Sequence, residues 1–195
     1  MRSFQTILVA ASTVVAANPA LMARAPTGSF NLYAYGSGIG GVPVVYDGDT
    51  AYAGFPSVFN STEAAPVLFE LSNNVLTGSP NSTTNSSPTW SNVTLYIPAP
   101  TSSSHSVGFI SGSSSNSSIL TSGFMFYGQD VLHKSSSGTL ETEWYAVPTD
   151  TEHIWTLAWN VTSDAVNGTV PISLRSAKPS TQTNDETDST TDDTE

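Results

Sequence analysis

The chain has 195 residues, with five basic and 16 acidic side chains, a formal net charge of −11 at pH 7 and no cysteine. This balance argues against binding to nucleic acids or anionic membranes, because very few side chains could neutralise phosphate groups. The length suits one domain, which must be held together by burial of apolar side chains rather than by disulfides.

The N-terminus is typical of a secretory signal peptide over residues 1–17. A short positively charged start precedes a mostly apolar run that ends in small residues. We expect cleavage after Ala17, with Ala20 and Ala23 as the alternatives. The apolar run is shorter than the roughly 20 residues of a membrane-spanning helix, so no integral membrane span is expected. Residues 18–29 are then a linker or short propeptide.

Residues 30–177 are predicted to form one all-β domain, a single antiparallel β-sandwich or jelly-roll-like fold. Short apolar segments alternate with spacers rich in Ser, Gly, Pro and Asn, and no segment carries a convincing helical stripe. Asp47-Gly48-Asp49 is a strong hairpin signal. The expected strands are 30–35, 42–46, 50–53, 67–71, 93–97, 106–110, 123–127, 139–147, 153–161 and 169–174.

Residues 178–195 are expected to be a disordered acidic tail. The segment is rich in Ser and Thr, carries six acidic residues and has no large apolar side chain. It cannot bury enough surface to offset the entropy lost on ordering. The chain ends in acidic and polar residues, without the hydrophobic tail of a glycolipid-anchor signal.

Seven of the 12 asparagines begin an Asn-x-Ser/Thr sequon, roughly twice the number expected from Ser and Thr content alone. Together with the signal peptide, this excess predicts N-glycosylation in the secretory pathway. Period-two alternation places Trp155, Leu157 and Trp159 on the core side of one strand, with Asn160 on its outer side. The candidate glycosylation sites are Asn60, Asn81, Asn85, Asn92, Asn116, Asn160 and Asn167.

Glu141 and Glu143 are the candidate catalytic residues. Their spacing on an extended strand puts both carboxylates on one face, about 6.5–7 Å apart at Cβ, near the separation of the carboxylate pairs of glycosidases. Laminarinase-like glucanases also alternate acidic residues on a strand, over a longer motif that this segment lacks. The alternative is a solvated polar face, with Leu140, Thr142, Trp144 and Ala146 turned inward, and we favour it here.

Other chemical motifs are weaker. Residues 36–41 match G-x-G-x-x-G, but a strand is predicted after them where a dinucleotide site needs a helix. His105, His133 and His153 lack metal-ligand spacing, and Asp47-Gly48-Asp49 is better explained as a turn than as a calcium site. No metal or cofactor is therefore expected.

Tyr33 and Tyr35 are the candidate binding residues. They share one face of the first strand, and exposed aromatic rings on a sheet can stack on the apolar faces of sugars. The alternative is that both rings cover a second core between two sheets.

Segments 30–36, 41–54, 148–150 and 171–176 resemble a group of secreted Ser/Thr-rich β proteins of filamentous ascomycete fungi. The resemblance implies a fungal extracellular or cell-wall location and brings no catalytic residues with it. We therefore expect a secreted glycoprotein that contacts cell-wall polysaccharide without catalysis. The alternatives are a glycoside hydrolase or lyase that uses Glu141 and Glu143, and a structural or host-interaction protein.

Overall fold

The structure is a computed structural model that describes residues 25–81, 87–112, 114–161 and 167–180. The predicted signal peptide, Asn85 and residues 181–195 of the tail lie outside these ranges. The described part confirms the all-β antiparallel prediction. Its one helical element is a single 3-10 turn, η1, at Pro56–Val58, and the described residues include no helix long and apolar enough to cross a membrane.

The described residues form fifteen strands, and every pairing between these strands is antiparallel. Their bounds are β1 Phe30–Asn31, β2 Tyr33–Gly36, β3 Ile39–Asp47, β4 Thr50–Gly54, β5 Ala65–Ser72, β6 Val75–Pro80, β7 Val93–Pro98, β8 Gly108–Ser111, β9 Ile119–Leu120, β10 Phe124–Tyr127, β11 Asp130–Lys134, β12 Leu140–Glu141, β13 Trp144–Pro148, β14 Ile154–Trp159 and β15 Val170–Arg175.

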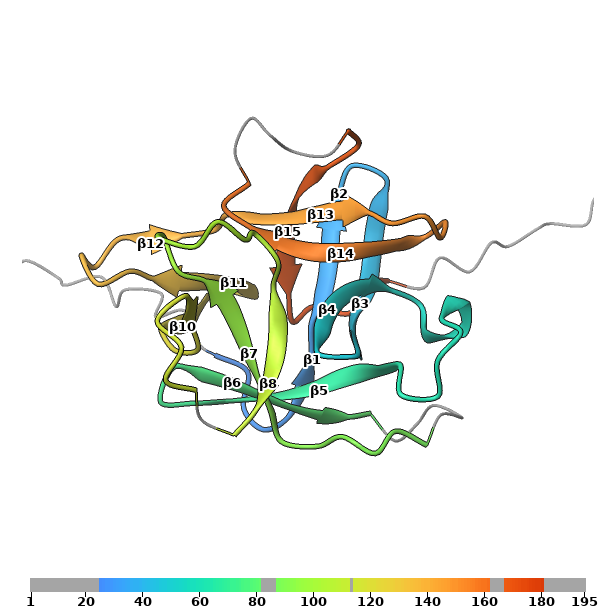
Figure 1. The fold of residues 1–195 in the computed structure, drawn as a ribbon, viewed down its shortest axis with the longest axis horizontal. Helices are drawn as coiled ribbons and strands as arrows, with labels where there is room; N and C mark the ends of the chain where they lie inside the picture. The colour runs from blue at the N-terminus through green and yellow to red at the C-terminus, as the bar shows by residue number, and fades with distance from the viewer. Residues whose placement is uncertain (1–24, 82–86, 113, 162–166, 181–195) are drawn as a thin grey trace, which may run out of the picture.

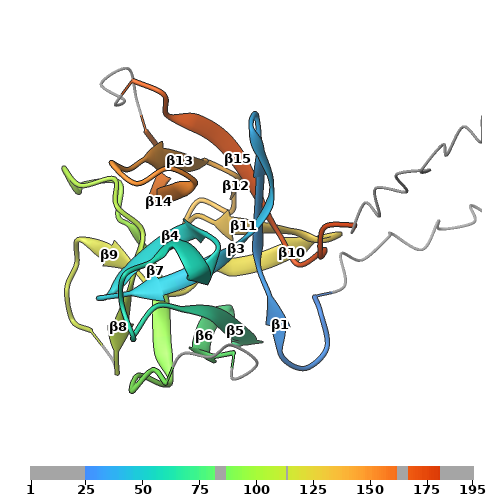
Figure 2. The same cartoon turned by 90° about the vertical axis from the view of Figure 1, so that its right-hand side faces the viewer.

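The sheet closes on itself (Figure 1). The hydrogen-bonded path runs β2–β3–β5–β6–β7–β8–β4–β14–β13–β15 and returns to β2 through the pairing of β15 with β2. Figure 2 shows β15 and β2 side by side, although they come from opposite ends of the chain. The β10–β11 hairpin extends from β15, and the short β12 pairs with β11. This closure brings distant segments to one rim of the sheet.

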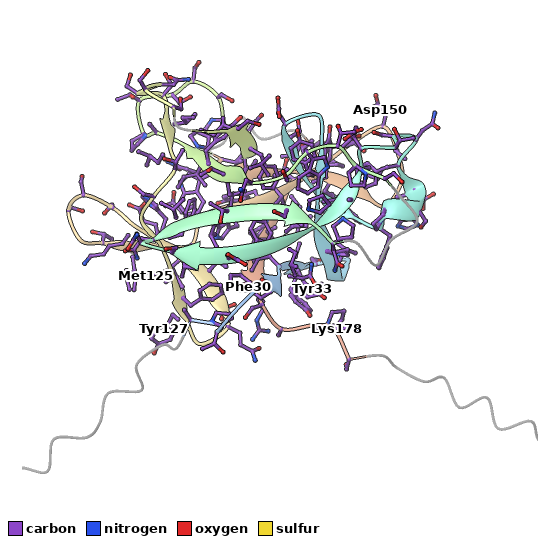
Figure 3. The ribbon with its side chains drawn as sticks, turned by 90° about the horizontal axis from the view of Figure 1, so that it is seen from below. Phe30, Tyr33, Met125, Tyr127, Asp150 and Lys178 are labelled. Carbon is purple, nitrogen blue, oxygen red and sulfur yellow. The ribbon has the colours of Figure 1, made fainter. Side chains whose placement is uncertain are left out.

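The core consists of apolar side chains that point inside the closed sheet. Its largest fully buried members are Trp144, Phe69, Phe109 and Phe124. Leu157 and Trp159 are buried as the strand alternation predicts, and Trp155 is half-buried against the core. Strand β10 shows the alternation clearly, because Phe124 and Phe126 are buried while Tyr127 is 66% exposed. Figure 3 shows Tyr127 at the periphery of the domain.

Asp47-Gly48-Asp49 forms the predicted hairpin turn between β3 and β4. Gly48 and Asp49 have φ angles of 57° and 67°, and positive φ at both central residues is what a type I′ turn requires. The Tyr46 hydroxyl donates a hydrogen bond to Asp49 Oδ1 at 2.8 Å, and Ser61 Oγ donates one to Asp47 Oδ1 at 2.7 Å. Both carboxylates are thus part of the turn.

Burial, followed by the hydrogen bond to Asp49, raises the pKa of Tyr46 to about 12. Because the folded-state pKa lies above the unfolded value of 10.0, the contribution of Tyr46 to folding stability is complete below pH 10 and is lost as the pH rises towards 12. We expect Tyr46→Phe to reduce this alkaline loss of stability. The loss is measured as the fall in the midpoint of urea unfolding between pH 10 and pH 12. Tyr127→Phe is the control and should leave the loss unchanged; an equal effect in both variants would contradict the assignment.

Candidate functional site

A cleft of about 660 Å³ opens at one rim of the closed sheet. Five segments contribute to its lining: residues 98–105, 120–123, 133–136, 141–143 and 159–160. Residues 101, 103, 121 and 142 within these segments do not face it. These segments lie far apart in the sequence and meet because β11, β12 and β14 are brought together by sheet closure. The cleft is larger and less open than the hollow of about 600 Å³ lined by Tyr35, Gly40 and Arg175, so we take it as the candidate site.

Glu141 and Glu143 both line this cleft. Glu141 lies in β12, directly opposite His133 of β11, and the Glu143 carbonyl accepts a hydrogen bond from the Asn160 amide at 2.9 Å. Of the side chains that the solvated-face alternative turned inward, Trp144 and Ala146 are buried, whereas Leu140 is 47% exposed and Thr142 is exposed. The two carboxylates therefore face a cavity rather than a bare sheet.

His133 is the buried polar residue of the site and is only 5% exposed. Its Nδ1 lies 3.3 Å from Glu141 Oε2, and its ring meets those of Phe124 and Trp159 edge to face at centroid distances of 6.0 and 5.9 Å. Gly123 lies against the other side of the imidazole, where an added Cβ would come within 2.7 Å of Nε2. The imidazole is thus held in place on every side and fixes the Glu141 carboxylate.

His105 joins the same cleft through backbone pairing with β14. The Trp159 amide donates to the His105 carbonyl at 2.8 Å, and His105 Nδ1 lies 3.1 Å from the Trp159 carbonyl. His153, in contrast, is exposed in a turn next to Glu152. Two of the three histidines therefore converge, yet the described ranges contain no group of three His, Cys, Asp or Glu that could hold a metal ion.

The remaining walls combine apolar and hydroxyl surface. Leu120, Trp159 and a proline-containing segment, residues 98–100, form the apolar side, and several serines and Lys134 supply polar groups. Apolar ring faces, hydroxyl partners and fixed carboxylates are the groups by which proteins hold polyhydroxylated ligands. The same two carboxylates could also act as an acid and a base on a bound glycoside.

Tyr33 and Tyr35 lie away from this cleft and are half-buried on one face of β2. The Tyr35 hydroxyl donates to the Ala177 carbonyl at 2.8 Å, and the Arg175 guanidinium lies 5.6 Å from the Tyr35 ring centroid. Figure 3 shows Tyr33 at the same edge of the view as Lys178. The Tyr35 ring is therefore partly engaged by the end of the domain, and stacking of a ligand on it stays a prediction.

Most of the predicted glycosylation sites within the described residues are exposed: Asn60, Asn92, Asn116, Asn160 and Asn167. Asn81 is half-buried. Asn92 and Asn160 have φ angles of 53° and 49° and lie immediately before β7 and after β14, at strand ends rather than on strand faces. Asn160 also lines the cleft.

The G-x-G-x-x-G segment at residues 36–41 forms the turn from β2 into β3, where a strand follows it. It lacks the helix that a dinucleotide site needs.

Comparison of the chain with protein-family models, with curated proteins and with solved structures finds no match. The site must therefore be interpreted from its own geometry.

Sequence reasoning missed most of the cleft lining, including His133 and Lys134. His133 follows two buried residues, Val131 and Leu132, so alternation gives no sign that it faces a cavity. The available signal was a histidine directly after two apolar residues, eight residues before Glu141.

Proposed function

We propose that the protein is an exported, N-glycosylated extracellular or cell-wall-associated protein that binds a saccharide in the cleft around Glu141 and Glu143. The observation that carries the proposal is the opening of both carboxylates into a cavity with an apolar side and hydroxyl-bearing walls. Export and glycosylation are supported by the signal-peptide pattern and by the seven sequons.

The chemistry of the cleft supports this ligand class. A pyranose ring presents apolar C–H faces, which can pack against accessible aliphatic surface such as that of Leu120 and Pro100. Its hydroxyl groups need fixed acceptors, and Glu141 is fixed by His133. A carboxylate held in one orientation loses less side-chain entropy when it binds, which favours selective recognition.

Hydrolysis is the second candidate, because the two carboxylates share one cavity. One carboxylic acid would donate its proton to the glycosidic oxygen while the other carboxylate takes a proton from an attacking water or attacks the anomeric carbon. Hydrolysis consumes one water and yields two saccharides with no redox change. The acidic side chains at the cleft are then catalytic residues instead of binding groups.

One experiment tests both candidates. The purified protein is incubated with chitin, β-glucan and mannan, and retained protein and released reducing sugar are measured together. Retention without release supports binding, and retention that weakens in Glu143→Gln assigns it to the cleft. Release that is abolished in Glu141→Gln or Glu143→Gln supports hydrolysis. Both candidates are overturned if the protein shows no retention and releases no sugar with any of the three polysaccharides or with soluble oligomers.

Glycosylation has a separate test. We expect the secreted protein to migrate as a heterogeneous band that an N-glycosidase collapses to the mass of the processed chain, about 18–19 kDa for the 20.4 kDa chain without its signal peptide. Mass spectrometry after enzymatic release would then show Asn-to-Asp conversion at the occupied sequons. A mass unchanged by the glycosidase would refute N-glycosylation.

A further inference from the structure

We propose that the cleft selects a saccharide with a free amino group, held through its ammonium by Glu143 together with Glu141. This inference rests on the proposed function and names its ligand class. It starts from the hydrogen-bonding and ionic capacity that the cleft leaves unused.

The first unused group is the Glu143 carboxylate. Glu143 is exposed into the cleft, and the ion pairs of the described residues do not include it. Its backbone carbonyl is occupied by the Asn160 amide, so the side chain alone is available. A carboxylate in a concave site with no basic partner from the protein is suited to a cationic ligand group, because the charge is not already compensated.

The second carboxylate is oriented by the buried His133. Within the described residues the imidazole makes one hydrogen bond, at Nδ1 to Glu141. Gly123 packs beside Nε2 and the residue is only 5% exposed, so His133 acts by fixing Glu141 rather than by reaching the ligand. Together these groups form a fixed frame: a pre-oriented Glu141 and a Glu143 outside the ion pairs of the described residues.

The charge balance of the cleft determines which sign of ligand charge it favours. Two carboxylates face it with one ammonium, that of Lys134, which is exposed at the end of β11. The whole chain carries a formal net charge of −11, the cleft residues included. The surrounding potential therefore attracts cations and repels uronic acids and other anionic sugars. The apolar wall still requires a sugar ring rather than a bare amine.

A matched pair of oligosaccharides tests the inference: a glucosamine hexamer and its fully N-acetylated counterpart of the same length, titrated calorimetrically in mildly acidic buffer that keeps the amine protonated. We expect the amine form to bind about tenfold more tightly, the effect of one charge-assisted contact. Added salt should reduce this preference. Glu143→Gln should remove it and Lys134→Gln should increase it.

Glu152→Gln is the matched control, because Glu152 is exposed in a turn outside the cleft. Equal weakening by Glu152→Gln and Glu143→Gln would overturn the inference, since it would indicate attraction by net charge alone. Equal binding of spermine and the glucosamine hexamer would overturn it as well, by removing the role of the sugar ring. If the acetylated hexamer binds with equal or higher affinity, the amine preference is overturned and saccharide binding still stands. If neither hexamer binds, the result counts against both proposals.

Discussion

Replacing Trp144 by alanine is expected to lower the free energy of unfolding by about 3–5 kcal/mol, the usual cost of deleting a large buried aromatic side chain. Trp144 is 1% exposed. Its ring stacks on Phe124 with the centroids 6.5 Å apart and meets the Trp159 ring edge to face at 4.7 Å. Its Nε1 donates to the Val131 carbonyl at 2.9 Å, so the substitution also leaves that buried acceptor without a partner.

Urea unfolding followed by far-ultraviolet circular dichroism measures this loss. Trp144→Phe should cost less than alanine, because it keeps most of the ring volume and loses the hydrogen bond. Tyr127→Ala is the surface control and should change the free energy by no more than about 0.5 kcal/mol. A cost below about 1 kcal/mol for Trp144→Ala would mean that the packing around this ring does not hold the domain together.

The strand faces of β14 could be predicted from the sequence because alternation and a sequon constrain the same segment. Leu157 and Trp159 alternate with polar or small residues, and a glycan on Asn160 would have to face water. The structure buries both apolar side chains and exposes Asn160. Trp155 is only half-buried near the start of the strand, since period-two patterns specify a face but not how far the core extends along it.

The cleft could not be predicted, because it depends on long-range pairing. His133 reaches Glu141 through the register of β11 with β12, and Trp159 reaches His133 through closure of the sheet. Neither contact leaves a periodic signal in the chain. The sequence did place Glu141 and Glu143 on one side, but it could not show whether a cavity or bulk water lies there.

Leu140 shows where the solvated-face interpretation fails, although Trp144 and Ala146 are buried as it predicted. An apolar residue between polar ones is normally assigned to the core. Strand β12 has only two residues, and among the described residues it pairs with β11 alone. So short a strand at the margin of the sheet leaves Leu140 47% exposed, while Glu141 lines the cleft.

The same rings support the core and shape the site. Phe124 and Trp159 pack on both the buried Trp144 and the cleft-lining His133. A rigid core thereby restricts the imidazole, and the imidazole restricts the Glu141 carboxylate. Stability and ligand binding should therefore be coupled at positions that contact His133, and Gly123 is the position that tests this coupling.

Gly123→Ala is expected to lower the free energy of unfolding by about 2–5 kcal/mol and to weaken ligand binding. Gly123 has a φ angle of 99°, where any other residue is strained by about 1–2 kcal/mol. Its added Cβ would also come within 2.7 Å of His133 Nε2 and 3.0 Å of the Lys134 carbonyl. Relieving those contacts requires the imidazole to move, at a further cost of about 1–3 kcal/mol.

Gly138→Ala separates the two contributions, because Gly138 has a similar φ angle of 90° but no heavy atom within 4 Å of an added Cβ. It should show the strain alone, about 1–2 kcal/mol, with saccharide affinity unchanged. The excess cost of Gly123→Ala then measures the displacement of His133, and the accompanying loss of affinity measures how strongly that displacement disturbs Glu141. Equal costs and equal affinities in the two variants would show that Gly123 is a turn glycine with no part in holding the site.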